Sequence, residues 1–285
     1  MTIDHGHLSP ILAAVGFSYF GLRFVEVMRA VFEGRHRAPA LQMAINYLIP
    51  FNMIAAGPIQ AYDDFVAQPE LPNSLTFRQT LAAAERIVFG LFKKFVLAVT
   101  VDRIFLTSFR AHGGYLFIEA QFYYIWLYLD FSAYTDIAIG IGSLLGVGTP
   151  ENFDRPYLAR NIVDFWQRWH ISLSLWVRRN LFLPIQLALV RRIQSNNQLF
   201  AASIAFLISF LLVGVWHNVS YRWLLWGLIQ ASGLIVCNAY RHILLKRKGR
   251  KWLNQQLVNP WQRAVSIAIT FEFFAFSLAA TMYTR

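Results

Sequence analysis

Two histidines lie inside hydrophobic stretches and are the first candidates for chemistry. His170 belongs to DFWQRWHISLSLWVRRNLFLP, and His217 belongs to GVWHNVSYRWLLWG. Imidazole titrates near neutral pH, so it can take and return a proton during a reaction. An ionisable side chain in an apolar stretch is costly and is by default a functional candidate. We therefore expect both histidines to act in catalysis. The alternative for His217 is a histidine that donates to a carbonyl at a helix break.

The segment around His170 is rich in aromatic and polar side chains. If this segment is one helix, Trp166, His170 and Ser174 share a face because they are four residues apart. Trp169 and Trp176, seven residues apart, share another face near His170. An aromatic belt at the lipid head groups and the wall of a ligand cavity both fit this pattern. The spacing leaves the two interpretations open.

Carboxylates are few, and their places limit the possible mechanisms. Asp130 and Asp136 lie in the apolar stretch YLDFSAYTDIAIGIG, where they could form a proton relay or could be neutralised by helix ends and neighbouring arginines. Nothing there has the spacing of a metal site, so we predict none. Glu272 is the only acidic residue after Asp164. A carboxylate that orients His217 must come from the N-terminal part or be Glu272.

Composition shows which elements must position these side chains. Hydrophobic residues make up 56% of the 285 residues, charged residues only 14%, and the mean hydropathy is +0.42. So little charge disfavours a soluble all-α core. A membrane helix needs about 20 mostly apolar residues, and we predict roughly eight or nine membrane-associated helices. The stretches are 10–32, 39–59, 79–107, 115–129, 131–148, 162–190, 199–217, 221–240 and 264–283.

Basic residues set the expected topology. The net charge of +11 comes from short runs between apolar segments, among them Arg191-Arg192 and the run from Arg241 to Lys251. Such loops face the cytoplasm and contact anionic membrane lipids, so this charge does not indicate nucleic-acid binding. The short connection at His217 then lies on the side away from the cytoplasm.

The chain has no long linker and no repeat, and we predict one transmembrane domain over residues 1–285. The single cysteine, Cys237, lies in an apolar segment and excludes a disulfide within the chain. The first apolar stretch carries Arg23, Glu26 and Arg29 at helical spacing. We expect this stretch either to pack inside a bundle or to follow helices that precede this sequence.

Four segments together resemble the membrane-bound O-acyltransferase family, in its bacterial branch of alginate O-acetyltransferases and teichoic acid D-alanyl transfer proteins. The resemblance covers about residues 15 to 280 and is most specific over 127–184. The segments are AAGPIQ (55–60), LYLDFSAYTDIAIGIGSLLG (127–146), PENFDRPYLARNIVDFWQRWHISLSLWVRRNLFLP (150–184) and GVWHNVSYRWLLWGL (214–228).

The resemblance implies an all-α polytopic membrane protein, a helical bundle with a tunnel through the bilayer. Family members move an acyl group from a thioester to a hydroxyl. The family's histidine, which follows a tryptophan between two membrane helices, matches His217. Its second motif, Arg-Trp-(His/Asn) followed by Trp and Arg, matches Arg168, Trp169, His170, Trp176 and Arg178.

Three features depart from the family pattern. Asn218 stands where bacterial relatives usually have glycine, and Gln60-Ala61 follows GPI where they usually have a basic residue. Both sites are expected near the tunnel, where they would alter the acceptor geometry. Family members are also commonly longer, so we expect this chain to lack their N-terminal helices.

The implied mechanism uses the two histidines together. His217 would be the general base that takes the proton of the acceptor hydroxyl as it attacks the thioester carbonyl. His170 would hold the acceptor or donate to the developing oxyanion. The side chains expected to shape the tunnel are Trp166, Trp169, Ser174, Trp176 and Asn218. Arg168 and Arg178 would pair with Asp130, Asp136, Asp154 or Asp164, or would face the phosphates of a thioester carrier.

Substrates and location follow from the same resemblance. The donor would be a short acyl thioester, on acetyl-CoA or a carrier protein, and no cofactor would be bound. The acceptor would be an exported polysaccharide or a secreted acyltransferase partner at a multi-pass inner-membrane protein. A proton- or ion-coupled transporter through Asp130, Asp136, His170 and His217 is one alternative. An inactive membrane scaffold is the other.

Overall fold

A computed structural model of the chain describes residues 8–68, 75–107, 116–193 and 198–282. The chain forms two compact units, one of residues 1–98 with 129–152 and one of residues 99–128 with 153–285. The prediction of a single domain stays a prediction.

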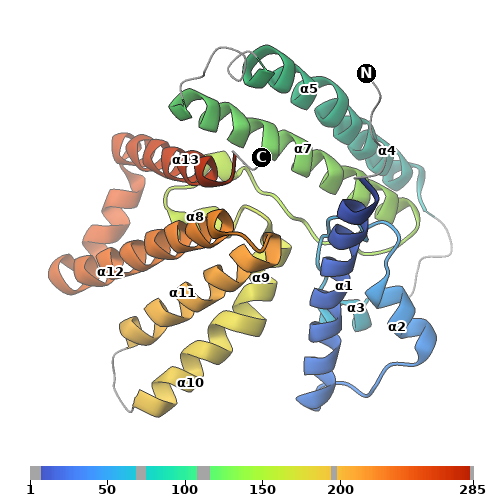
Figure 1. The fold of residues 1–285 in the computed structure, drawn as a ribbon, viewed down its shortest axis with the longest axis horizontal. Coiled ribbons are helices and arrows are strands. Elements are labelled where there is room, and N and C mark those ends of the chain that lie inside the picture. Colours follow the sequence, from blue (N-terminus) through green and yellow to red (C-terminus); the bar gives the residue numbers. More distant parts are fainter. Residues whose placement is uncertain (1–7, 69–74, 108–115, 194–197, 283–285) are drawn as a thin grey trace. The chain divides into compact units, whose positions relative to one another are not determined.

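The described residues form helices and contain no strand, which confirms the prediction of an all-α membrane protein (Figure 1). The elements are α1 (Leu8–Phe32), α2 (Leu41–Leu48), α3 (Tyr62–Val66), α4 (Phe77–Phe92), η1 (Lys93–Ala98), α5 (Val99–Val101), η2 (Asp102–Leu106), α7 (Leu116–Leu144), η3 (Pro156–Leu158), α8 (Ile162–Trp166), α9 (Ile171–Val177), η4 (Arg178–Phe182), α10 (Leu183–Ile193), α11 (Gln198–His217), α12 (Tyr221–Val258) and α13 (Pro260–Met282). Elements η1, η2 and η4 are π-helical, and η3 is a 3₁₀ helix.

Three of the described helices are long and apolar enough to cross a membrane. These spans cover Gln198–His217, Tyr221–Trp252 and Pro260–Thr281. The stretches predicted separately at 115–129 and 131–148 form one continuous helix, α7. Helix α12 extends well past the apolar stretch predicted at 221–240 and is kinked at Gly249, where φ is 79°.

The stretch 39–59 does not form the predicted membrane helix. Only α2 is helical there, and the chain then turns through Pro50 and the Gly57-Pro58 pair. The buried guanidinium of Arg23 donates to the carbonyls of Met53 and Pro58, at 2.9 and 3.1 Å. Proline removes a backbone donor and disfavours helix before it, so hydrophobicity alone misled this prediction.

Helices α11 and α12 form an antiparallel hairpin (Figure 1). Two glycines lie where the helices touch. A Cβ atom added at Gly214 would lie 2.3 Å from the carbonyl oxygen of Trp223. One added at Gly227 would lie 2.4 Å from the carbonyl oxygen of Phe210. The absence of both side chains therefore lets the two helix backbones touch, as in other membrane helix pairs. This hairpin carries His217 at its turn.

Candidate active site

The segment from Asp164 to Pro184 is not the single helix that its spacing predicted. Helix α8 ends at Trp166, and α9 begins only at Ile171, because His170 takes a left-handed backbone conformation with φ 44°. Left-handed residues do not continue a right-handed helix. The expectation that Trp166, His170 and Ser174 share a helix face is therefore wrong, as is the shared face of Trp169 and Trp176.

Asn161 caps the start of α8. Its side-chain oxygen accepts from the backbone N–H of Asp164 at 2.9 Å. Asn161 thus satisfies one of the free donors at the helix start. Shortly before α8, Arg155 is also left-handed, with φ 45°. Two non-glycine residues in this uncommon conformation bracket α8, which indicates that tertiary contacts hold the segment in place.

Arg168 fixes the break between α8 and α9. Its Nε donates to Asp164 at 2.7 Å, and its Nη1 donates to the Asp154 carboxylate at 3.2 Å. The hydrogen bond with Asp164 raises the pKa of Arg168, which stays cationic. The backbone of Asp154 also donates to the carbonyl of Arg168 at 2.9 Å, next to a bridge between Phe153 and Trp169. Of the two roles predicted for Arg168, the structure shows the ion pair.

Trp169 and His170 are both buried, at 5% and 3% exposure. The Trp169 ring stacks on Phe165, with centroids 5.7 Å apart, and contacts Tyr124 and Phe274. This tryptophan therefore lies in the core of its unit and not in an aromatic belt at the lipid surface. It holds the residue next to it, His170, on the inside of the unit.

His217 ends α11 and lies among three tryptophans. Its ring stacks on Trp223 at 4.7 Å with an interplanar angle of 22°. Trp216 and Trp226 approach it edge-on, at 4.7 and 5.6 Å. His217 stays exposed despite these contacts, whereas His170 is buried. His217 is therefore oriented by aromatic rings and open to a ligand.

The contacts that the structure describes for His217 are aromatic. Glu272, the acidic residue expected as one possible partner of His217, binds another residue. The Glu272 carboxylate accepts two hydrogen bonds from Nε2 of Gln121, at 2.8 and 3.0 Å. A carboxylate–histidine pair, the usual means of orienting a catalytic imidazole, is not among the contacts that the structure describes for His217. The Trp223 ring is stacked on the imidazole instead.

Aromatic contacts join the two histidine regions within one unit. Trp226, which contacts His217, also contacts the Trp166 ring at 6.1 Å. The Nε1 of Trp166 donates to Oε1 of Gln230 on α12 at 3.2 Å. Contacts between Trp166 and Trp226 thus link the segment that carries His170 to the turn that carries His217.

A cavity of about 390 Å³ lies beside this site. Ile171, directly after His170, lines it, as does Val213, one turn before His217 on α11. Its wall is mostly apolar, and Ser209 contributes a fully buried hydroxyl that has no hydrogen-bond partner among the described residues. The remaining lining residues are Val163, Trp166, Gln167, Leu173, Ser174, Leu175, Val177, Arg178, Phe182, Phe206, Phe210 and Leu234.

Three of the other predicted site residues differ in their surroundings. Arg178 begins η4, is exposed, and has no ion-pair partner in the described part of the chain. Trp176 is buried in α9, and its carbonyl accepts from Asn180 at 3.0 Å. Asn218 is exposed in the turn that follows His217. Trp166, Ser174 and Arg178 line the cavity, whereas Trp169, Trp176 and Asn218 do not.

Asp130 and Asp136 belong to the other unit and are already paired. Asp130 accepts from Lys94 at 2.5 Å, and Asp136 pairs with Lys93 and Arg86. These contacts favour the structural interpretation of both acids, with lysine as well as arginine as the partner. No three described His, Cys, Asp or Glu side chains are grouped so that they could hold a metal ion.

Sequence reasoning missed three residues of the site. Trp223 and Trp226 contact His217, and Gln230 binds Trp166. Trp223 and Trp226 are three residues apart, directly after the turn at His217. That helical spacing was a usable signal for a second wall of the site.

A model of the membrane-bound O-acyltransferase family matches residues 10–281 of this chain. A teichoic acid D-alanyltransferase of Bacillus subtilis is 28% identical to it over 276 residues, which is 93% of this chain and 68% of that protein. A peptidoglycan O-acetyltransferase of Helicobacter pylori is 34% identical over 202 residues, 69% of this chain and 37% of the relative.

A probable alginate O-acetylase of Pseudomonas aeruginosa is 30% identical over 226 residues, 77% of this chain and 42% of that protein. The chain therefore spans about two thirds of the D-alanyltransferase and less than half of the two acetyl-transferring relatives.

Proposed function

Because this chain belongs to the membrane-bound O-acyltransferase family, we propose that it transfers a short acyl group from a thioester to a hydroxyl acceptor at the membrane. The main support is that exposed His217 and buried His170 belong to one unit, in segments that aromatic contacts join. A mostly apolar cavity is lined by Ile171, next to His170, and by Val213, one turn before His217.

His217 is the proposed general base. It takes the proton of the acceptor hydroxyl while the hydroxyl oxygen attacks the thioester carbonyl, and the proton then leaves with the thiolate. Its exposure lets an acceptor reach the ring, and the stacked Trp223 limits its rotation. A positioned base of this kind contributes about 10²–10⁴ in rate.

His170 is the proposed second group. Its left-handed backbone and deep burial fix the position of the ring, which suits a donor that must meet a developing oxyanion in one place. The cavity beside it is larger than an acetyl or alanyl group, so it also holds part of the donor arm. Arg178 at its edge is the proposed contact for donor phosphate.

We further propose acetyl-CoA or a carrier-protein thioester as donor, with no bound cofactor. The acceptor is an exported polysaccharide or a secreted partner that passes the acyl group on, because three relatives carry names of teichoic acid, peptidoglycan and alginate modification. The proposed setting is the inner membrane, crossed several times.

Thioester turnover by the purified, membrane-reconstituted chain tests this function. His217→Ala should reduce acyl transfer by about 10²-fold or more, since the general base is lost. His217→Ala should leave detergent thermal stability and elution volume unchanged, because the residue is exposed. Arg241→Gln, on the same hairpin but remote in sequence, is the matched control. Full activity of His217→Ala would remove this residue from the mechanism.

A further inference from the structure

The turn at His217 gathers buried hydrogen-bond donors that lack acceptors. Ser209 Oγ, Ser220 Oγ, Arg222 Nη1 and Trp226 Nε1 are each buried without a hydrogen-bond partner among the described residues. Ser220, Arg222 and Trp226 lie in or directly after this turn, whereas Ser209 lies more than two helical turns earlier on α11, in the cavity wall. An unsatisfied buried donor costs about 1–3 kcal/mol, and native proteins keep few of them. Their concentration here indicates a place that a ligand with acceptor oxygens completes.

Arg222 is the charged member of this group. Its Nε donates to the Tyr221 hydroxyl at 3.1 Å, and its Cζ lies 5.7 Å from the centre of the Tyr221 ring. Tyr221 itself is 72% exposed. The tyrosine therefore orients the guanidinium without neutralising it, and the buried Nη1 has no hydrogen-bond partner among the described residues.

No described carboxylate compensates this charge. Glu272, the only acidic residue after Asp164, binds Gln121, while Asp154 and Asp164 both bind Arg168. Loop charge also predicts that the α11–α12 turn faces away from the cytoplasm. Loops on that side of a membrane usually contain fewer arginines than cytoplasmic loops. On this orientation, the positive-inside rule does not account for Arg222.

Arg222 and Trp226 are four residues apart on α12 and therefore lie on the same helix face. Trp226 contacts the His217 ring, with centroids 5.6 Å apart. A ligand group bound by Arg222 would thus lie beside the proposed general base. The exposed residues Asn218, Val219 and Tyr221 leave this turn open.

We propose that the turn from Asn218 to Arg222 recognises a negatively charged group of the acceptor, a phosphate or a carboxylate, through Arg222. The inference rests on the proposed acyl transfer and adds the acceptor class to it. Arg222 binds the anionic oxygen and Tyr221 positions the guanidinium. The acceptor hydroxyl near that anion then meets His217. Guanidinium groups suit this task because they offer several donors to one oxyanion.

The test compares charged acceptors with neutral counterparts that lack the anionic group. The full chain, reconstituted in phosphatidylcholine vesicles with acetyl-CoA, is given methyl glucuronide or methyl glucoside, and sn-glycerol 3-phosphate or glycerol. Arg222→Gln should raise KM for the charged member of each pair by about 10–100-fold, the size of a charge-assisted hydrogen bond. The kcat/KM for the neutral members should not change.

Two further variants separate binding from structure. Tyr221→Phe keeps the ring and removes the hydroxyl that accepts from Arg222, so it should raise the same KM by a smaller factor. Arg241→Gln removes one exposed positive charge from α12 and should leave acceptor preference unchanged. An equal loss with charged and neutral acceptors in Arg222→Gln would show a structural role and overturn the inference, as would no effect at all.

The head group of an anionic lipid offers the same phosphate chemistry as a charged acceptor. Adding phosphatidylglycerol to the vesicles tests whether such a lipid is the ligand of Arg222. If Arg222→Gln changes the response to this lipid and not to acceptor charge, a head group is the ligand, and the acceptor assignment is wrong. Stabilisation of the folded chain by sn-glycerol 3-phosphate, lost in Arg222→Gln, supports the anion site without any turnover. If sn-glycerol 3-phosphate stabilises the chain but no acyl transfer that depends on Arg222 is measured, the proposed function is wrong. The acceptor assignment is then wrong as well.

Discussion

His170 shows at the scale of one residue why a motif position accepts few side chains. Its φ of 44° belongs to the left-handed region, which asparagine, aspartate and histidine enter more readily than most other non-glycine residues. The family motif that the sequence resembles has His or Asn at this position. The backbone conformation gives a physical reason for that choice, and both side chains can donate a hydrogen bond.

Substitution of His170 separates its backbone role from its donor role. His170→Ala should lower acyl transfer by about 10²–10³-fold, since an oxyanion donor is removed. His170→Asn tolerates the left-handed backbone and offers an amide N–H, so it should keep more activity than alanine. Steady-state transfer rates and melting temperatures of both variants are the measurements. Equal, mild losses would assign His170 to packing alone.

At the scale of elements, the close packing of α11 against α12 depends on two glycines rather than on apolar side chains that fit together. Both glycines face backbone atoms of the other helix, which cannot move away as a flexible side chain could. The sequence pattern predicted the hairpin and the place of its turn, and both are confirmed. The closeness of the two helices was not predictable from apolar periodicity, because it depends on which face each glycine occupies.

Gly214→Ala should destabilise the hairpin by about 1–3 kcal/mol, because its Cβ would clash with the Trp223 carbonyl. Thermal unfolding in detergent measures this loss, and transfer activity should fall with it because His217 is one turn away. Gly21→Ala is the control. A Cβ added at that helical glycine would have no atom within 4 Å, so alanine should be neutral or stabilise by up to ~1 kcal/mol. Equal behaviour of the two variants would contradict the packing argument.

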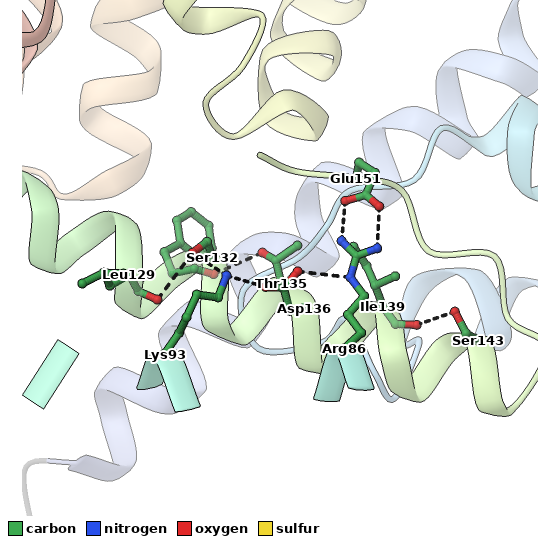
Figure 2. A network of polar contacts seen from close by, with 10 residues as sticks. Arg86, Lys93, Leu129, Ser132, Thr135, Asp136, Ile139, Ser143 and Glu151 are labelled. Atoms are coloured by element: carbon green, nitrogen blue, oxygen red, sulfur yellow. Dashed lines mark hydrogen bonds and ion pairs between the residues drawn. The ribbon is translucent and has the colours of Figure 1, made fainter. Parts of the chain in front are cut away.

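A charged network joins α4, η1 and α7 in the other unit (Figure 2). Figure 2 shows Lys93 and Arg86 reaching toward Asp136, with Arg86 also bound to Glu151 through two hydrogen bonds of 2.6 Å. Lys93 also donates to Ser132 at 2.9 Å. The two cations are balanced by two carboxylates, so the network can lie among apolar helices without net charge.

Asp136→Asn should cost about 3–5 kcal/mol, because it leaves the buried Lys93 ammonium without its counter-charge. Glu151→Gln should cost no more than ~1 kcal/mol, since the Glu151 side chain is 58% exposed and solvent screens its pair with Arg86. Denaturation of the two purified variants under identical conditions measures the difference. Comparable losses would show that Asp136 is not the centre of the network.

At the scale of the whole molecule, charge and hydrophobicity set the topology. Loop charge predicts that the turn after His217 and the basic run from Arg241 to Lys251 lie on opposite sides of the membrane. The span beginning at Tyr221 is long enough for this arrangement.

Cysteine labelling tests this topology in a Cys237→Ala background. A membrane-impermeant maleimide should label Val219→Cys in whole cells, because that side chain is 87% exposed in the turn. Lys248→Cys, exposed on the basic run, should be labelled only after lysis. The reversed pattern would invert the orientation, and labelling of both sites in intact cells would exclude α12 as a span between them.

The sequence by itself determined the class of this protein. Its scarcity of charge demands helices in a membrane, and the motifs around His170 and His217 identified a family to which the chain does belong. These features are local, so they can be recognised from the composition, the length of the apolar stretches and the spacing of the motif residues. The tertiary structure decided that the Asp164–Pro184 segment breaks at His170, and that Trp223, Trp226 and Arg222 surround the turn at His217. The left-handed conformation of His170 is held by tertiary contacts such as the ion pairs of Arg168. Such contacts produce no periodic pattern in the sequence.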